Sequence, residues 1–101
     1  MPRPEEVTPT NLRRIEFLSL TGEGYVPTGQ AWVDEDSCVQ GDSDEANSIL
    51  DGAVGAPNVE TGRTATREDG PLLLYGLCLE AMNATYWNIR VLEVAPDDKG
   101  Q

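Results

Sequence analysis

Residues 75–94, YGLCLEAMNATYWNIRVLEV, decide how this chain folds, because the first half can be read as a helix or as a strand. A helix would place Gly76 in its interior, at a cost of about 1 kcal/mol relative to Ala. A strand would use Gly76 to admit a close neighbour or a bulge. From Trp87 onward apolar and polar residues alternate, which is typical of a half-buried strand. The segment predicts a hairpin over residues 72–94, with Gly76, Cys78 and Trp87 as structural residues.

The rest of the chain adds short strands and one helix. Residues 13–20, RRIEFLSL, alternate as a half-buried strand does, and residues 29–34 form a second short strand after a loop with two turn signals. An acidic capping pattern predicts a short helix at about 43–51. One further short strand is expected near 62–67. These elements indicate a mainly β fold, a small antiparallel barrel or sandwich with one helix.

The chain divides into one domain with loose ends. Residues 1–11 carry three prolines and polar neighbours, which is typical of an extended N-terminal arm. Residues 12–96 form a single β-rich domain by this reading, and residues 97–101 form a C-terminal tail. The N-terminus lacks the apolar core of a signal peptide, and no run is long enough to span a membrane, so we expect a soluble protein without membrane contact.

The charge is strongly negative, with 18 acids against 7 bases and a formal net charge of −11. No Lys or Arg occurs between Arg14 and Arg63, and Lys99 is the single lysine. A surface of this kind repels phosphate, which argues against direct binding of nucleic acid. The lysine-poor, acid-rich composition resembles that of halophilic proteins, whose self-repulsion is screened at high salt. A protein that mimics nucleic acid would have a similar composition.

The residues for common catalytic and metal sites are missing. The chain has no histidine, so no serine–histidine or cysteine–histidine arrangement can form. Cys38 and Cys78 lack metal-site spacing, and we expect free thiols with Cys78 in the core, a single bridge between them being the alternative. The acidic stretch 34–45 does not match a calcium-binding loop. The sequence therefore predicts a protein that is not an enzyme and binds no cofactor or metal.

The quoted segment resembles the closing strands of viral capsid decoration proteins. Gly76, Leu77 and the residues that follow to Ala81 match the first part of that pattern, and NIRVLEV at 88–94 matches its alternating strand. VPTGQAWV at 26–33 is similar to the strand that opens the core in that family. The resemblance implies a small β-rich domain that sits on a capsid lattice as a trimer, often with an extended N-terminal arm.

The function expected from this resemblance is that of a non-enzymatic structural protein of a virus particle. It would be made in the host cytoplasm, reside in the virion, and bind the major capsid protein or another virion protein as a homo-oligomer, with a trimer favoured. Val7, Tyr25 and Trp32 are the expected partner contacts. Two alternatives stay open: a head–tail connector or tail component, and an acidic inhibitor that mimics DNA.

Overall fold

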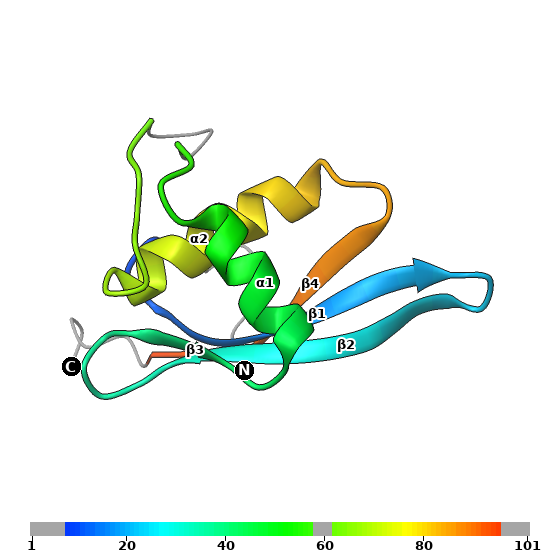
Figure 1. Cartoon of the computed structure of the whole chain (residues 1–101), viewed down its shortest axis with the longest axis horizontal. Coiled ribbons are helices and arrows are strands. Elements are labelled where there is room, and N and C mark those ends of the chain that lie inside the picture. The colour runs from blue at the N-terminus through cyan, green and yellow to red at the C-terminus, as the bar shows by residue number, and fades with distance from the viewer. Residues whose placement is uncertain (1–7, 58–61, 96–101) are drawn as a thin grey trace.

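The computed structural model describes residues 8–57 and 62–95, which form one four-stranded antiparallel sheet with two helices on one of its faces (Figure 1). The strands follow the order β3-β2-β1-β4 across the sheet. The prediction of a mainly β, antiparallel fold is confirmed, but the sheet is open and does not close into a barrel. The elements in chain order are β1 (Leu12–Thr21), β2 (Gly24–Val33), β3 (Val39–Gly41), α1 (Asp44–Ala53), α2 (Gly70–Met82) and β4 (Trp87–Val94).

Strands β1 and β2 form a long hairpin, and their pairing extends from Arg14 and Trp32 to Thr21 and Gly24 beside the turn. Gly24 follows the turn with φ of 102°, a conformation that glycine adopts without strain. The register shifts between Phe17 and Leu18, and Pro27 lies opposite Leu18 at this irregularity. A bulge is one of the few places where a sheet tolerates proline. The loop expected before residue 29 was therefore wrong, because β2 already begins at Gly24.

Helix α1 forms where it was predicted. Its N-cap is Ser43, whose hydroxyl accepts the amide of Ala46 at 3.1 Å. Asp44 and Glu45 occupy the first turn, where the helix dipole favours negative charge. Ala46 and Leu50, four positions apart and therefore on one face of the helix, are buried in the core. The Ser43 side chain thus provides a hydrogen-bond acceptor for an amide of the first turn, and the helix buries one narrow apolar face.

Helix α2 overturns the predicted hairpin over 72–94. Residues from Gly70 to Met82 are helical, so Gly76 lies in a helix interior rather than in the sheet. Pro71 in the first turn fits a helix start, since its missing N–H is not needed there. Buried Leu73, Leu74 and Leu77 each contribute about 1.5–3 kcal/mol, more than the glycine costs. Only the second half of the hairpin, β4, is a strand.

The core lies between the sheet and the two helices. The segment near 62–67, expected as a strand, has no strand structure, and its last residue, Arg67, bonds to β3 through the amide of Val39. Cys78 and Trp87 are half-buried and pack against the core. The sheet face opposite the helices has no second layer among the described residues, so no sandwich of two sheets forms. The buried apolar side chains are Leu12, Ile15, Phe17, Ala31, Val39, Ala46, Leu50, Ala65, Leu73, Leu74, Leu77 and Ala81.

Candidate protein-binding surface

Two segments distant in the sequence meet at one end of the molecule: the tip of the β1–β2 hairpin and the loop between α2 and β4 (Figure 1). The hydroxyl of Tyr25 donates to the carbonyl of Thr85 at 3.0 Å, although 60 residues separate them. The amide of Leu20 donates to the carbonyl of Tyr86 at 2.9 Å. Leu20 and Tyr25 also face each other across the hairpin. These bonds hold the end in one shape.

Large apolar side chains at this end point into solvent. Tyr86 is 78% exposed, Met82 76%, and Leu20 and Tyr25 are each 43% exposed. We call these four residues the apolar end. Scattered exposed apolar residues are normal, but a group of them marks a surface for protein contact. Tyr and Met are also enriched at protein interfaces.

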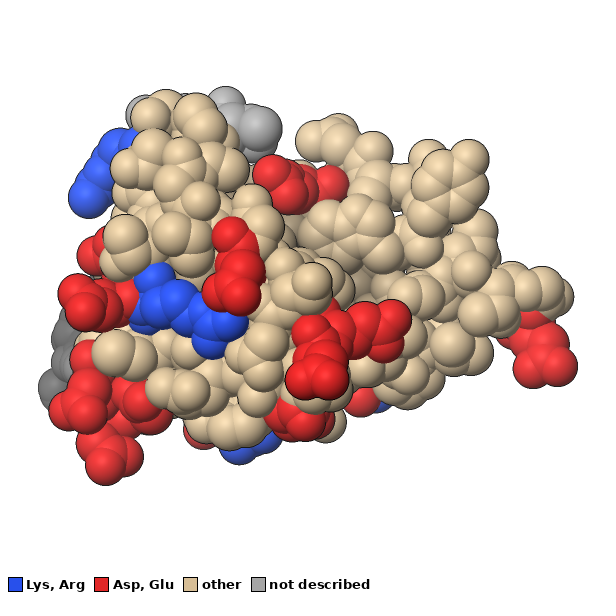
Figure 2. Space-filling model, in the orientation of Figure 1, with Lys and Arg blue, Asp and Glu red and all other residues tan. Residues whose placement is uncertain are grey.

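The acidic side chains gather elsewhere. Figure 2 shows red groups over α1 and at the opposite end of the molecule, whereas the end that holds the hairpin tip is tan apart from a red group at its outermost point. The acids concerned lie on α1, before it, and in the β2–β3 loop: Asp34, Glu35, Asp36, Asp42, Asp44, Glu45 and Asp51. Glu23 is exposed in the turn at the hairpin tip. The molecule therefore has one strongly negative region and one nearly uncharged end.

The β2–β3 loop is built around one carboxylate. Oδ1 of Asp34 accepts the amides of Asp36 and Cys38 at 2.9 and 3.0 Å, and Oδ2 accepts from the side chain of Gln40 at 3.0 Å. The bond from the Cys38 amide, followed by that from Gln40, lowers the pKa of Asp34 below its usual value. Asp34 therefore organises the loop as an ionised group.

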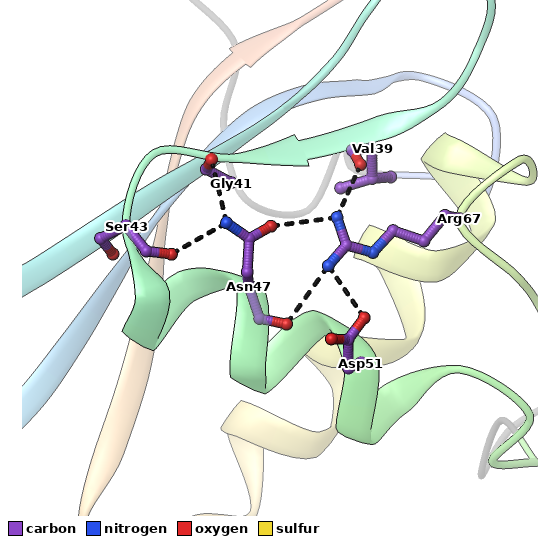
Figure 3. Close-up of polar contacts among 6 residues, drawn as sticks. All are labelled: Val39, Gly41, Ser43, Asn47, Asp51 and Arg67. Atoms are coloured by element: carbon purple, nitrogen blue, oxygen red, sulfur yellow. Dashed lines mark hydrogen bonds and ion pairs between the residues drawn. The ribbon is translucent and has the colours of Figure 1, made fainter.

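Arg67 ties the coil before α2 to α1 and β3 (Figure 3). One guanidinium nitrogen donates to the carbonyl of Val39 and to Oδ1 of Asn47, both at 3.1 Å. The other donates to the carbonyl of Asn47 at 3.2 Å and to Asp51 at 2.9 Å. Asn47 in turn donates to the carbonyls of Gly41 and Ser43. This network satisfies backbone carbonyls and serves the fold.

The uncovered sheet face carries a second polar network. Arg14 lies over the ring of Trp32, 5.4 Å from its centroid, and donates to Gln30 at 3.1 Å. Glu16, in the central strand, is buried on this face and forms an ion pair with Arg90. Trp32 is half-buried beneath Arg14, whereas Tyr86 of the apolar end is 78% exposed.

The structure separates the three expected partner contacts. Tyr25 belongs to the apolar end, whereas Trp32 lies at the far end of the same strand, about 24 Å along β2 at the usual rise per residue. Val7 lies outside the described residues. Sequence reasoning missed Met82 and Tyr86, although large apolar side chains beside an expected turn were a usable signal.

The described residues hold little that resembles a catalytic centre. No group of three or more Cys, Asp or Glu side chains among them is placed to bind a metal ion. A cavity of about 20 Å³ between α1 and α2, lined by residues such as Leu73 and Gly76, has room for about one water molecule. Both cysteines are free; burial raises the pKa of Cys78 to about 11, and burial followed by nearby acids raises that of Cys38. Such thiols are weak nucleophiles.

Comparisons with known proteins return nothing: no family model, no curated protein and no solved structure matches this chain. No helix among the described residues is long and apolar enough to cross a membrane.

Proposed function

We propose that this protein is a non-enzymatic component of a larger assembly, and that it binds another protein through the apolar end. The observation that carries the proposal is the exposure of Leu20, Tyr25, Met82 and Tyr86 at one end of a highly acidic molecule, where Glu23 is the acid of the hairpin turn and most of the described acids lie elsewhere. Water contact with these side chains is unfavourable, and a partner that covers them gains about 25 cal/mol per Å² of apolar area.

The end is also well suited to rapid and stable docking. The bonds from Tyr25 to Thr85 and from Leu20 to Tyr86 order it before a partner arrives, so binding costs little conformational entropy there. Tyrosine is enriched among the few residues that supply most of the binding free energy of an interface. Because most of the described acidic side chains lie elsewhere, electrostatic self-repulsion opposes contact at this surface less than it would over α1.

The narrower form of the proposal is a virion protein that decorates and stabilises a capsid lattice as an oligomer. Its partner would be the major capsid protein or another virion protein. In the alternative form of this proposal, the protein is a head–tail connector or a tail component and binds elsewhere on the virus particle. The resemblance supports this form through residues 26–33 and 88–94, which lie in strands β2 and β4. Residues 76–81, which were expected as a strand, lie in α2 and no longer support it.

An acidic inhibitor of a basic protein is the second candidate. Asp44, Glu45 and Asp51 lie on α1, a regular helix. Carboxylates held on a helix can present a spaced row of negative charge to the basic groove of a nucleic-acid-binding protein. In that case the acidic region would be the binding surface, and the apolar end would contribute little.

A photocrosslinking experiment distinguishes the two candidates. A photoreactive amino acid is placed at Tyr86 in the apolar end, at Glu45 on α1, or at the exposed Val54 as the control, and the protein is crosslinked in the cells that make it. Crosslinks from position 86 to one defined protein, retained at about 1 M NaCl, support the assembly proposal. Crosslinks from position 45 to a basic protein, lost at that salt, support the inhibitor. Equal crosslinking from all three positions, or from none, refutes the proposal.

A further inference from the structure

The two edges of the sheet are protected to different degrees. Strand β3 has three residues, and its outer edge is covered because the amide of Val39 donates to the carbonyl of Arg67 at 2.9 Å. The guanidinium of Arg67 also occupies the carbonyl of Val39. Strand β4 has eight residues and pairs with β1 alone within the described part of the chain. An open edge of about 27 Å is a template for another strand.

Both the backbone and the side chains of β4 favour the addition of another strand at this edge. The amide of Ile89 donates to the side-chain oxygen of its neighbour Asn88 at 2.8 Å, a local substitute for a strand carbonyl. Trp87, Ile89 and Val91 point toward the helices, yet they remain half-buried, whereas Phe17 beside them in β1 is fully buried. A further strand would extend the core across these three side chains.

The charge distribution identifies the partner that fits this edge. Residues 84–92 contain one base, Arg90, and no acid, in a chain of net charge −11. Helix α1, with its acids, packs on β2 and β3, at the opposite side of the sheet from β4. Two copies that meet at β4 therefore keep their acidic regions as far apart as the sheet allows, because electrostatic repulsion falls with distance.

We propose that a second copy of this chain adds to β4, antiparallel, about a twofold axis through Ile89. The two sheets then become one, with both pairs of helices on the same side. Ile89 faces Ile89 of the other copy, Trp87 faces Val91, and Asn88 faces Arg90. Centring the pair on Arg90 would oppose two arginines, and like charges directly opposite destabilise a sheet. This pair replaces the trimer that the resemblance implies, and it does not depend on what the apolar end binds.

Asn88 offers a sharp test because it is exposed and lies opposite Arg90 of the second copy twice in the pair. Asn88→Lys and Asn88→Glu both remove the bond to the Ile89 amide, so they are matched in their effect on the isolated chain. By net charge alone, lysine would promote association and glutamate would oppose it. By the proposed register the order reverses, because lysine meets arginine and glutamate forms an ion pair.

Sedimentation velocity over about 5–500 µM measures the association, a range suited to the micromolar dissociation constant expected of a modest interface. We expect a concentration-dependent dimer, weakened about tenfold by Asn88→Lys and unchanged or tightened by Asn88→Glu. Hydrogen exchange at the Ile89 amide should slow as the dimer forms. A monomer at all concentrations, a trimer, or tighter association of Asn88→Lys than of Asn88→Glu would overturn the proposal.

Discussion

Replacing Arg67 with alanine tests how far one side chain holds the helix layer to the edge of the sheet. The Arg67 side chain is 28% exposed, and its guanidinium makes three partly buried hydrogen bonds to Val39 and Asn47. At about 1 kcal/mol of net stabilisation for each bond, the substitution costs about 3 kcal/mol. The ion pair with Asp51 adds less than about 1 kcal/mol, because that carboxylate is 73% exposed and screened by water.

For a chain of this size a loss of about 3 kcal/mol lowers the melting temperature by about 12–24 °C. Thermal and urea unfolding, followed by circular dichroism at about 0.5 M NaCl, measures the change while screening the altered net charge. Arg67→Lys should recover only a minor part of the loss, since lysine cannot reproduce the planar fork that reaches two elements at once. Asp51→Asn is the matched control, with a loss below about 1 kcal/mol.

The reasoning fails if Asp51→Asn destabilises the protein as much as Arg67→Ala does. That result would assign the stabilisation to the exposed ion pair rather than to the bonds with Val39 and Asn47. A double-mutant cycle between positions 67 and 51 isolates the pairwise contribution, which should remain below about 1 kcal/mol. A loss for Arg67→Ala of less than about 1 kcal/mol would also refute the estimate.

Three further predictions concern single sites. Gly70→Ala should destabilise the protein by about 1–3 kcal/mol in urea unfolding despite the better helix propensity of alanine, because the new Cβ would lie 2.5 Å from a backbone oxygen. Cys78 should be alkylated at pH 8 more slowly than Cys38, as peptide mass spectrometry can show. Burial raises the pKa of Cys78 from 9.0 to about 11, which leaves about a hundredfold less thiolate than an ordinary cysteine has at this pH. Asp34→Asn should lower the free energy of unfolding at pH 7, because a carboxyl whose pKa is depressed in the folded state stabilises the fold only while it is ionised. The difference from the unsubstituted protein should disappear as the pH is lowered through the depressed pKa of Asp34, as acid-unfolding curves can show. Asp36→Asn is the charge-matched control.

Strands β1 and β4 and helix α1 could be predicted from the sequence alone, because the pattern of apolar and polar residues in each of them fits one type of secondary structure. The alternation of apolar and polar residues predicted β1 and β4 as strands, and α1 carries both its cap and a single apolar stripe. The excess of acids and the absence of histidine were also evident without a structure. These features are local, since each depends on residues within a few positions of one another.

The helical state of residues 70–82 depends on tertiary packing. Nearly every residue there is apolar, so neither a helical nor a strand period stands out, and intrinsic preference is weak against the burial of several leucines. The apolar end depends on contacts between positions 25 and 85, which no local pattern reveals. Packing of the leucines against the sheet favours the helix over a strand at residues 70–82. Folding also brings exposed side chains that are distant in the sequence to one end of the molecule. Neither outcome could be predicted from local sequence, because both depend on contacts between residues far apart in the chain.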